Sequence, residues 1–273
     1  MSEARELPRR IVVAGDGQLG VLAAVAMRQA LPASEVLVIG TPPDGAAIAD
    51  MMPTALSFTS RLHDRLGLAE ELLVKRAGGS HRLAVEWRGW GGEGHRAVTA
   101  LGGAVDPALK SVFAREWGGG PRNAATGSAV YSVNEALVTA GRFMPPDGNP
   151  DTPLSDIDYA LRWNMPAYRD LLIALAAQLG VKHVAGVIEA VLPDAEGGLQ
   201  AVRVAGGGEV AADLFIDCTG PQAVLASKLP GARQIDWGAM LPIRELVFAR
   251  PRAIELALSD GIELTAQGWV SQF

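Results

Sequence analysis

The chain contains 273 residues, 49% of them hydrophobic and 20% charged, and carries a formal net charge of −6 at pH 7. This composition is typical of a globular protein with a sizeable core, and the acidic balance disfavours nucleic acid as a partner. No apolar run is long enough to cross a bilayer, and Met1–Arg10 lacks the apolar core of a signal peptide. The single cysteine, Cys218, excludes an internal disulfide, and the four histidines lack ligand-like spacing, so we expect a cytoplasmic protein without a metal or a membrane partner.

A strand, a glycine turn and a helix are expected at the start of the chain. Ile11–Ala14 is apolar and rich in β-branched residues, and an Ala-rich run follows from Val21. Between them lie three glycines, of which the first permits a tight turn, the second lets backbone approach a pyrophosphate, and the third lets helix and strand pack closely. The candidate dinucleotide-binding residues of this turn are Gly15, Gly17, Gln18, Leu19 and Gly20.

A second strand is expected over Glu35–Ile39, which completes a βαβ unit and predicts a parallel sheet covered on both faces. In dinucleotide-binding folds a carboxylate after this strand binds the ribose hydroxyls. Here Gly40 stands in that place, and Asp44 is the candidate substitute. No nearby arginine replaces it as a partner for a 2′-phosphate, so nothing favours NADP.

The middle of the chain alternates between helical and glycine-rich segments. Apolar spacing predicts one or two short helices over Ala55–Arg76, turning at Gly67. Glycine and tryptophan dominate Gly78–Arg122, which we interpret as short strands and loops of a cap or insertion. A helix is expected from Met165 to Leu179, because Pro166 lies in its first turn and Gly180 follows its end.

Strands and turns alternate over the next part of the chain. Val181–Val187 and the residues around Val191 lead through a turn at Asp194–Gly198 into Leu199–Val204. After glycines 206–208 the chain enters Asp213–Gly220, which we expect to be a buried strand ending in small residues.

The remaining cofactor-binding candidates lie at the ends of two expected strands, Asp213–Gly220 and Val181–Val187. Ligands of open α/β sheets bind beyond the carboxyl ends of the strands, so Asp217 and Gly220 are candidate cofactor-binding residues. The alternative is that Asp217 only caps the following turn. Val187 either offers backbone to an adenine or belongs to the core.

Three ordered segments resemble the flavin-dependent tryptophan halogenases: Gly15-Asp-Gly-Gln-Leu-Gly20, the run from Gly141 to Asn164, and Asp213-Leu-Phe-Ile-Asp-Cys-Thr-Gly220. The resemblance covers most of Arg10 to Leu229. It implies an α/β fold, with a Rossmann-like FAD-binding domain that has a central parallel sheet plus a β-meander, and an inserted or incomplete substrate domain. The nucleotide-binding parts are then expected at about 10–60 and 160–235, the insertion at 61–159, and the start of an incomplete second domain at 236–273.

The resemblance also implies a chemistry. FAD is reduced by a separate flavin reductase, and the reduced flavin uses oxygen and halide to halogenate an electron-rich aromatic substrate such as indole. The catalytic lysine of the family falls nearest Arg82, which keeps the positive charge but cannot act as an amine nucleophile. His81 is adjacent and faces the opposite side of a strand. The glycines of the family's Gly-x-Gly-Glu-Ala-Thr segment are missing from Ala46–Met51.

Two other functions stay open. These departures from the family pattern favour a catalytically degenerate, flavin-binding scaffold that acts through a partner, and the glycine turn alone also fits an NAD(P)-dependent reductase. The sequence leaves the oligomeric state undetermined. It predicts exposed apolar surface near Leu241–Phe248 and at Trp269.

Overall fold

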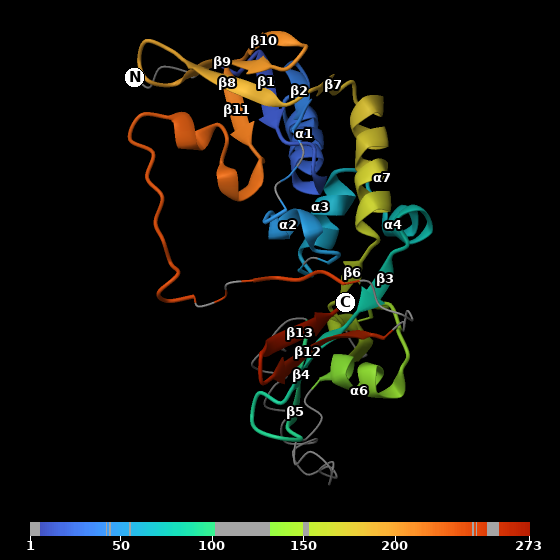
Figure 1. Cartoon of the computed structure of the whole chain (residues 1–273). Coiled ribbons are helices and arrows are strands. Elements are labelled where there is room, and N and C mark those ends of the chain that lie inside the picture. The colour runs from blue at the N-terminus through green and yellow to red at the C-terminus, as the bar shows by residue number, and fades with distance from the viewer. Residues whose placement is uncertain are drawn as a thin grey trace, which may run out of the picture. The chain divides into compact units, whose positions relative to one another are not determined.

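The computed structural model describes residues 6–41, 43, 45–54, 56–101, 132–149, 153–241, 243, 245–249 and 257–273. The chain forms two compact units, which Figure 1 colours along the sequence. The first unit combines Met1–Met52 with Met165–Arg252, and the second combines Pro53–Asn164 with Ala253–Phe273. The chain thus leaves the first unit after its βαβ segment and later returns to it.

The first unit is built on a four-stranded sheet in the order β11-β1-β2-β7. The strands are β1 (Arg10–Ala14), β2 (Glu35–Gly40), β7 (Lys182–Ala185) and β11 (Leu214–Asp217), and every pairing in this sheet is parallel. In this register Ala14 lies between Ile39 and Asp217. Because all four strands run the same way, their carboxyl ends meet at one edge, where ligands of such sheets bind.

Both faces of this sheet are covered, as expected for a parallel sheet. On one face, Ile11 and Val13 pack with Ala24 of helix α1 (Gln18–Ala30), and helix α7 (Met165–Gln178) packs beside α1 (Figure 1). On the other face, Val12 and Ala14 pack against the antiparallel meander β8 (Ile188–Pro193), β9 (Leu199–Val204) and β10 (Gly208–Ala211). Alternate residues of β1 therefore enter two different cores, which explains its unbroken apolar run.

The strand expected over Asp213–Gly220 differs from its prediction in burial. Its regular part, β11, lies at the edge of the sheet and pairs with β1. Leu214 is 38% exposed and the other residues of β11 are half-buried. The prediction of a buried strand was therefore wrong, because an apolar run alone does not distinguish a central strand from an edge strand.

The second unit contains two sheets. Strand β3 (Ser80–Arg82) pairs with β6 (Ala160–Arg162), and a second sheet has the order β13-β12-β4-β5. Its strands are β4 (Ala84–Arg88), β5 (Arg96–Ala100), β12 (Ser259–Thr265) and β13 (Gly268–Gln272). Because β12 runs parallel to β4 and pairs with it, the C-terminal strands share a sheet with the inserted segment, whereas the sequence placed them in a separate second domain.

Short helices complete both units. The expected helix pair is confirmed as α3 (Thr59–Arg65) and α4 (Glu70–Ala77), with Gly67 between them at a φ of +75°. Helix α6 (Val133–Ala140) also belongs to the second unit, and the first unit contains the single turn α2 (Ile48–Met51). The remaining turns are the 3-10 helices η1 (Pro153–Asp156), η2 (Gly220–Gln222) and η3 (Ala226–Lys228).

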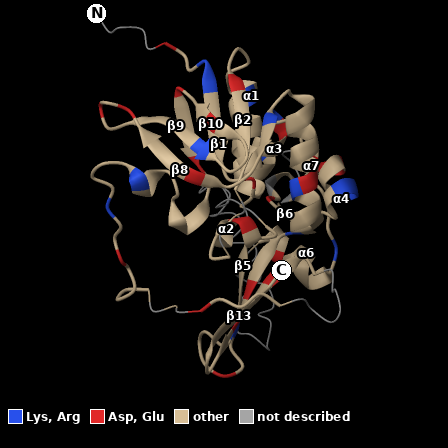
Figure 2. Cartoon of the chain, turned by 45° about the horizontal axis from the view of Figure 1, so that its top comes forward, with Lys and Arg blue, Asp and Glu red and all other residues tan. Residues whose placement is uncertain are grey.

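The surface agrees with one sequence expectation, the exposed apolar residues near the end of the chain. Acidic and basic residues are interspersed along the elements in Figure 2. Leu241, Val247 and Trp269 are 58%, 75% and 45% exposed, which confirms the predicted apolar surface. Among the described helices, none has the length and hydropathy needed to cross a membrane.

Candidate functional site

The glycine turn between β1 and α1 is too tight for side chains at two of its three glycines. A Cβ on Gly15, whose φ is +105°, would lie 2.4 Å from the carbonyl oxygen of Cys218 on the neighbouring chain segment. A Cβ on Gly20 would lie 1.9 Å from the carbonyl oxygen of Gly15. The first glycine thus allows the turn and the third allows close contact between α1 and β1, as the spacing predicts.

The second glycine, Gly17, precedes the first residue of α1 and provides no side-chain cap. A helix N-terminus leaves backbone N–H groups without intrahelical partners and carries a partial positive charge, so it binds anions. In this structure the Asp50 carboxylate lies over the turn: its Oδ1 accepts a hydrogen bond from the N–H of Leu19 at 3.0 Å. A Cβ on Gly17 would lie 2.4 Å from the same oxygen.

Asp50 was not a sequence candidate, although it belongs to the segment that departs from the family pattern. Its position is fixed by Gln18, which is buried and donates hydrogen bonds from Nε2 to the carbonyl oxygens of Ala49 and Met52 at 2.8 and 3.1 Å. Gln18 therefore acts by holding α2 against α1. The signal for Asp50 in the sequence was its place in Ala46–Met51, the segment from which the family's glycines are missing.

A hollow of about 350 Å³ opens at the carboxyl edge of the sheet beside this turn. It is lined by Leu19, the segment Ala46–Asp50, Asp217, Cys218, Gly220 and Pro221. The structure therefore brings together five of the predicted cofactor residues, Gly15, Gly17, Leu19, Asp217 and Gly220, at one end of the first unit.

Asp217 is occupied by its own loop. Its Oδ1 accepts hydrogen bonds from the backbone N–H and hydroxyl of Thr219, and its Oδ2 accepts them from the N–H groups of Leu225 and Ala226, at 2.6 to 3.1 Å. The carboxylate thus shapes the wall of the hollow, which matches the capping alternative. Gly220, with a φ of +82°, starts the turn that this carboxylate holds.

The thiol of Cys218 lies on the same wall. Burial raises the pKa of the Cys218 thiol, and the carboxylates of Asp50 and Asp217 raise it further. A thiol with a raised pKa stays protonated at neutral pH and is a poor nucleophile. Cys218 therefore acts as a small, half-buried apolar side chain.

The end of β2, where a ribose-binding carboxylate was expected, is surrounded by charged groups from elsewhere in the chain. A Cβ on Gly40 would lie 3.0 Å from Cε1 of His183 and 3.3 Å from Oδ2 of Asp16. Arg169 of α7 donates from its NH2 group to Asp16 Oδ2 and from Nε to the Asp16 carbonyl oxygen, both at 2.6 Å. Packing of α7 beside α1 brings Arg169, which is distant from Gly40 in sequence, to this position, and its guanidinium is paired with Asp16.

Asp44 and Val187 are the other two candidates for binding the adenosine part of a dinucleotide. Asp44 lies outside the described residues. Val187 is 50% exposed, and its carbonyl oxygen accepts a hydrogen bond from the N–H of Ala205 at 2.9 Å. The alternative that Val187 belongs to the core was therefore wrong, whereas its neighbour Ile188 is buried.

Arg82 belongs to the second unit and is only 6% exposed, so it is not a solvated surface charge. Its NH1 group lies 2.5 Å from Oδ2 of Asp260 and donates to the hydroxyl of Thr54 at 2.7 Å. Arg162 approaches the other oxygen of Asp260 at 3.6 Å. Burial lowers the pKa of Arg82 and raises the pKa of Asp260, and their mutual attraction opposes both shifts.

His81 faces away from this cluster, as strand alternation predicts. Its Nε2 lies 2.7 Å from Oε1 of Glu70, and its ring stacks on Phe143 with centroids 3.8 Å apart. Tyr159 donates its hydroxyl to the second oxygen of Glu70 at 2.6 Å. His81 thus has partners that Arg82 does not share.

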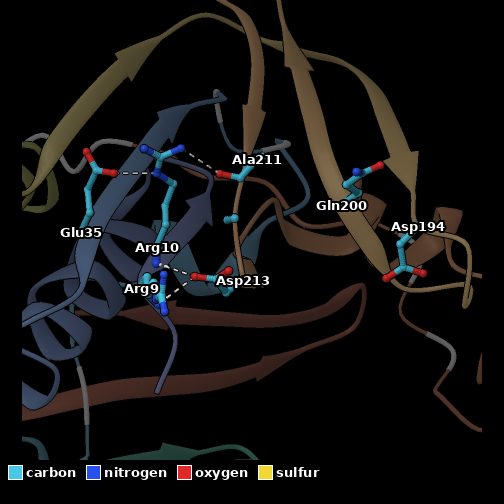
Figure 3. A pocket seen from close by; sticks show the side chains of 8 residues that line it. Arg9, Arg10, Glu35, Asp194, Gln200, Ala211 and Asp213 are labelled. Atoms are coloured by element: carbon cyan, nitrogen blue, oxygen red, sulfur yellow. Dashed lines mark hydrogen bonds and ion pairs between the residues drawn. The ribbon is translucent and has the colours of Figure 1, made fainter. Parts of the chain in front are cut away.

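A larger hollow, of about 510 Å³, lies at the opposite, amino edge of the first unit's sheet (Figure 3). Its charged side chains are engaged with one another and with nearby backbone: Arg10 binds Glu35 at 2.6 Å, and Asp213 accepts from the backbone N–H groups of Arg9 and Arg10. These contacts hold the starts of β1, β2 and β11 together. This hollow is therefore a weaker candidate than the carboxyl edge.

Comparison with known proteins gives consistent relatives. The family described as tryptophan halogenase matches residues 10–258. The chain is 26% identical over 240 residues to tryptophan 7-halogenase RebH of Lentzea aerocolonigenes, covering 80% of this chain and 44% of that protein. It is 28% identical over 240 residues to tryptophan 7-halogenase KtzQ of Kutzneria sp. (strain 744), covering 81% and 44%.

Solved structures agree at the level of the fold. The flavin-dependent halogenase BrvH of Brevundimonas sp. BAL3 superposes with a TM-score of 0.76 at 24% identity, covering 96% of this chain and 53% of that one. The chain thus spans about half the length of the relatives that it matches. The Rossmann-like α/β fold expected from the sequence is confirmed.

Proposed function

Because the chain belongs to the tryptophan halogenase family, we propose that it holds the FAD of a flavin-dependent halogenase that acts on an electron-rich, indole-type substrate. The observation that carries the proposal is the glycine turn. Gly15 and Gly20 permit a backbone path that no other residue fits, and this path presents the N-terminus of α1 at the carboxyl edge of the sheet.

The residues of the turn fit a dinucleotide in all respects but one. Backbone N–H groups of the turn would bind the diphosphate, Gly17 leaves room for its approach, and the loop held by Asp217 would form the wall of the site. Asp50 is the exception, because its carboxylate is a like charge beside Leu19 and has to move for a diphosphate to bind.

The bound FAD would supply the oxidative chemistry: its reduced form, produced by a separate reductase, reacts with oxygen and halide to give the halogenating species. The part of this chain in that reaction is to bind and orient the cofactor. Arg82, at the position of the family lysine, keeps a positive charge, but its contacts with Asp260 and Thr54 support a structural role over a catalytic one.

Flavin titration tests the proposal. FAD added to the purified protein should lose fluorescence on binding and raise the melting temperature, since a ligand that binds the native state stabilises it. Halogenation is then assayed with a flavin reductase, NADH, oxygen, bromide or chloride, and an indole substrate. Halogenated product supports the full proposal. Binding without product favours the flavin-binding scaffold, and binding of NADPH in place of FAD favours the reductase.

A further inference from the structure

We propose that Asp16, a residue of the glycine turn itself, supplies the carboxylate that recognises the adenosine ribose, in place of the residue that follows β2 in other dinucleotide-binding folds. This inference rests on the proposed binding of FAD. It assigns a specificity-determining role to a residue that the spacing of the glycines leaves unrestricted.

The Asp16 carboxylate lies close to the end of β2, where other dinucleotide-binding folds place their ribose-binding residue. Its Oδ2 lies 3.3 Å from where a Cβ on residue 40 would be built. A ribose-binding carboxylate on residue 40 would extend from that point, so Asp16 places its charge in the same region from a different part of the chain. Gly40 itself has little space for a side chain, because the ring of His183 would lie 3.0 Å from its Cβ.

Asp16 is held in a fixed orientation by its neighbours. Arg169 binds both the carbonyl oxygen and the Oδ2 atom of Asp16 at 2.6 Å, which fixes backbone and side chain together. His183 adds a contact from Nε2 to Oδ2 at 3.4 Å. A planar guanidinium with several donors in a fixed geometry makes such a two-point contact, which a lysine cannot reproduce. Arg169 is thus a positioning residue.

One oxygen of the Asp16 carboxylate stays available for a ligand. Both side-chain contacts of Asp16 are made by Oδ2, and its Oδ1 has no hydrogen bond within the described part of the chain. The carboxylate is 14% exposed, so it is accessible at the carboxyl edge of the sheet. A carboxylate oxygen without a partner can accept a hydrogen bond from a ribose hydroxyl.

The charge balance also indicates which ribose is recognised. Arg169 is already paired with Asp16, so a 2′-phosphate would meet the carboxylate rather than a free guanidinium. A ribose with an unmodified 2′-hydroxyl, as in FAD, fits this arrangement, whereas a 2′-phosphate is repelled.

The test measures binding of ADP and 2′-deoxy-ADP by competition with FAD fluorescence quenching. Wild-type protein should prefer ADP by about tenfold, the effect of one hydrogen bond to a charged group. In Asp16→Asn this preference should fall to about twofold, because the amide is a weaker acceptor for the hydroxyl. Arg169→Lys should lose part of the preference, and Asp170→Asn, an exposed neighbour of Arg169, should keep all of it.

Binding of FMN, which contains the flavin part of FAD without the adenosine, provides a second measurement. FMN lacks the adenosine ribose, so its affinity should be the same in wild type and Asp16→Asn. The inference would be overturned if Asp16→Asn lost the same factor of affinity for ADP and for 2′-deoxy-ADP. It would also be overturned if wild-type protein bound adenosine 2′,5′-bisphosphate more tightly than ADP. Either result would leave the proposed binding of FAD intact. If neither FAD nor ADP binds to wild type, the proposed function fails, and the ribose assignment fails with it.

Discussion

The Asp50 carboxylate accepts a hydrogen bond from the backbone N–H of Leu19 at 3.0 Å, and both residues line the hollow at the carboxyl edge of the sheet. A carboxylate that lies close to the N-terminus of a helix stabilises that helix through its partial positive charge. At a site that binds a diphosphate, the same carboxylate opposes the ligand. If FAD binds as proposed, Asp50 links the stability of α1 to the affinity for the cofactor.

Replacing Asp50 with Asn should change stability and affinity in opposite directions. We expect the free energy of unfolding to fall by about 0.5–1 kcal/mol, since a favourable charge at the helix N-terminus is lost. The affinity for FAD should rise about threefold to tenfold at low ionic strength and less at high salt. Urea unfolding and FAD titration measure the two effects. The exposed Asp64→Asn in the second unit is the matched control, and weaker FAD binding by Asp50→Asn would contradict the prediction.

Gly20→Ala should destabilise the first unit strongly. The new Cβ would lie 1.9 Å from the carbonyl oxygen of Gly15, so helix α1 has to move away from β1. We expect a loss of about 3 kcal/mol in the free energy of unfolding, as for severe overpacking. Chemical denaturation measures this loss. Gly45→Ala is the control, because no heavy atom lies within 4 Å of its Cβ position, and equal stability of the two variants would refute the tight contact.

Asp260→Asn should destabilise the second unit, because Arg82 and Arg162 would lose their shared buried partner. Breaking a buried ion pair from one side costs about 3–5 kcal/mol, since the remaining charge is left uncompensated. Thermal and urea unfolding report this change. Glu263→Gln on the same strand is exposed and should alter stability by about 0.5 kcal/mol or less. A similar small effect for Asp260→Asn would show that the cluster is not needed for folding.

Cys218 should make stability depend on pH in the alkaline range. Its pKa is raised by burial and by Asp50 and Asp217, so the folded state keeps the thiol proton to higher pH than the unfolded chain does. The contribution is complete below the pKa of a free thiol, about 8.5, and is lost as pH rises through the folded pKa. Urea unfolding of wild type and Cys218→Ala between about pH 7.5 and 10 measures the difference. Parallel pH curves for the two proteins would contradict the shift.

Much of the first unit was predictable because local patterns and packing agree there. The glycine spacing, the apolar run of β1 and the helix signals at Pro166 and Gly180 each depend on neighbours in sequence, and each matches an observed element. The position of β11 at the sheet edge was not predictable, since its burial depends on whether another strand lies beside it.

The candidate site also contains features that local sequence predicts and contacts that only packing creates. The sequence by itself determined the turn, its three glycines and the family, because covalent geometry and backbone sterics require particular residues at particular spacings. Only the tertiary structure placed Asp50 over the turn, Arg169 against Asp16, and Asp260 beside Arg82. These pairs join residues from 31 to 178 positions apart in the chain. Such contacts depend on how helices and strands pack, and the free energy that selects them comes from burial and charge in three dimensions rather than from local spacing.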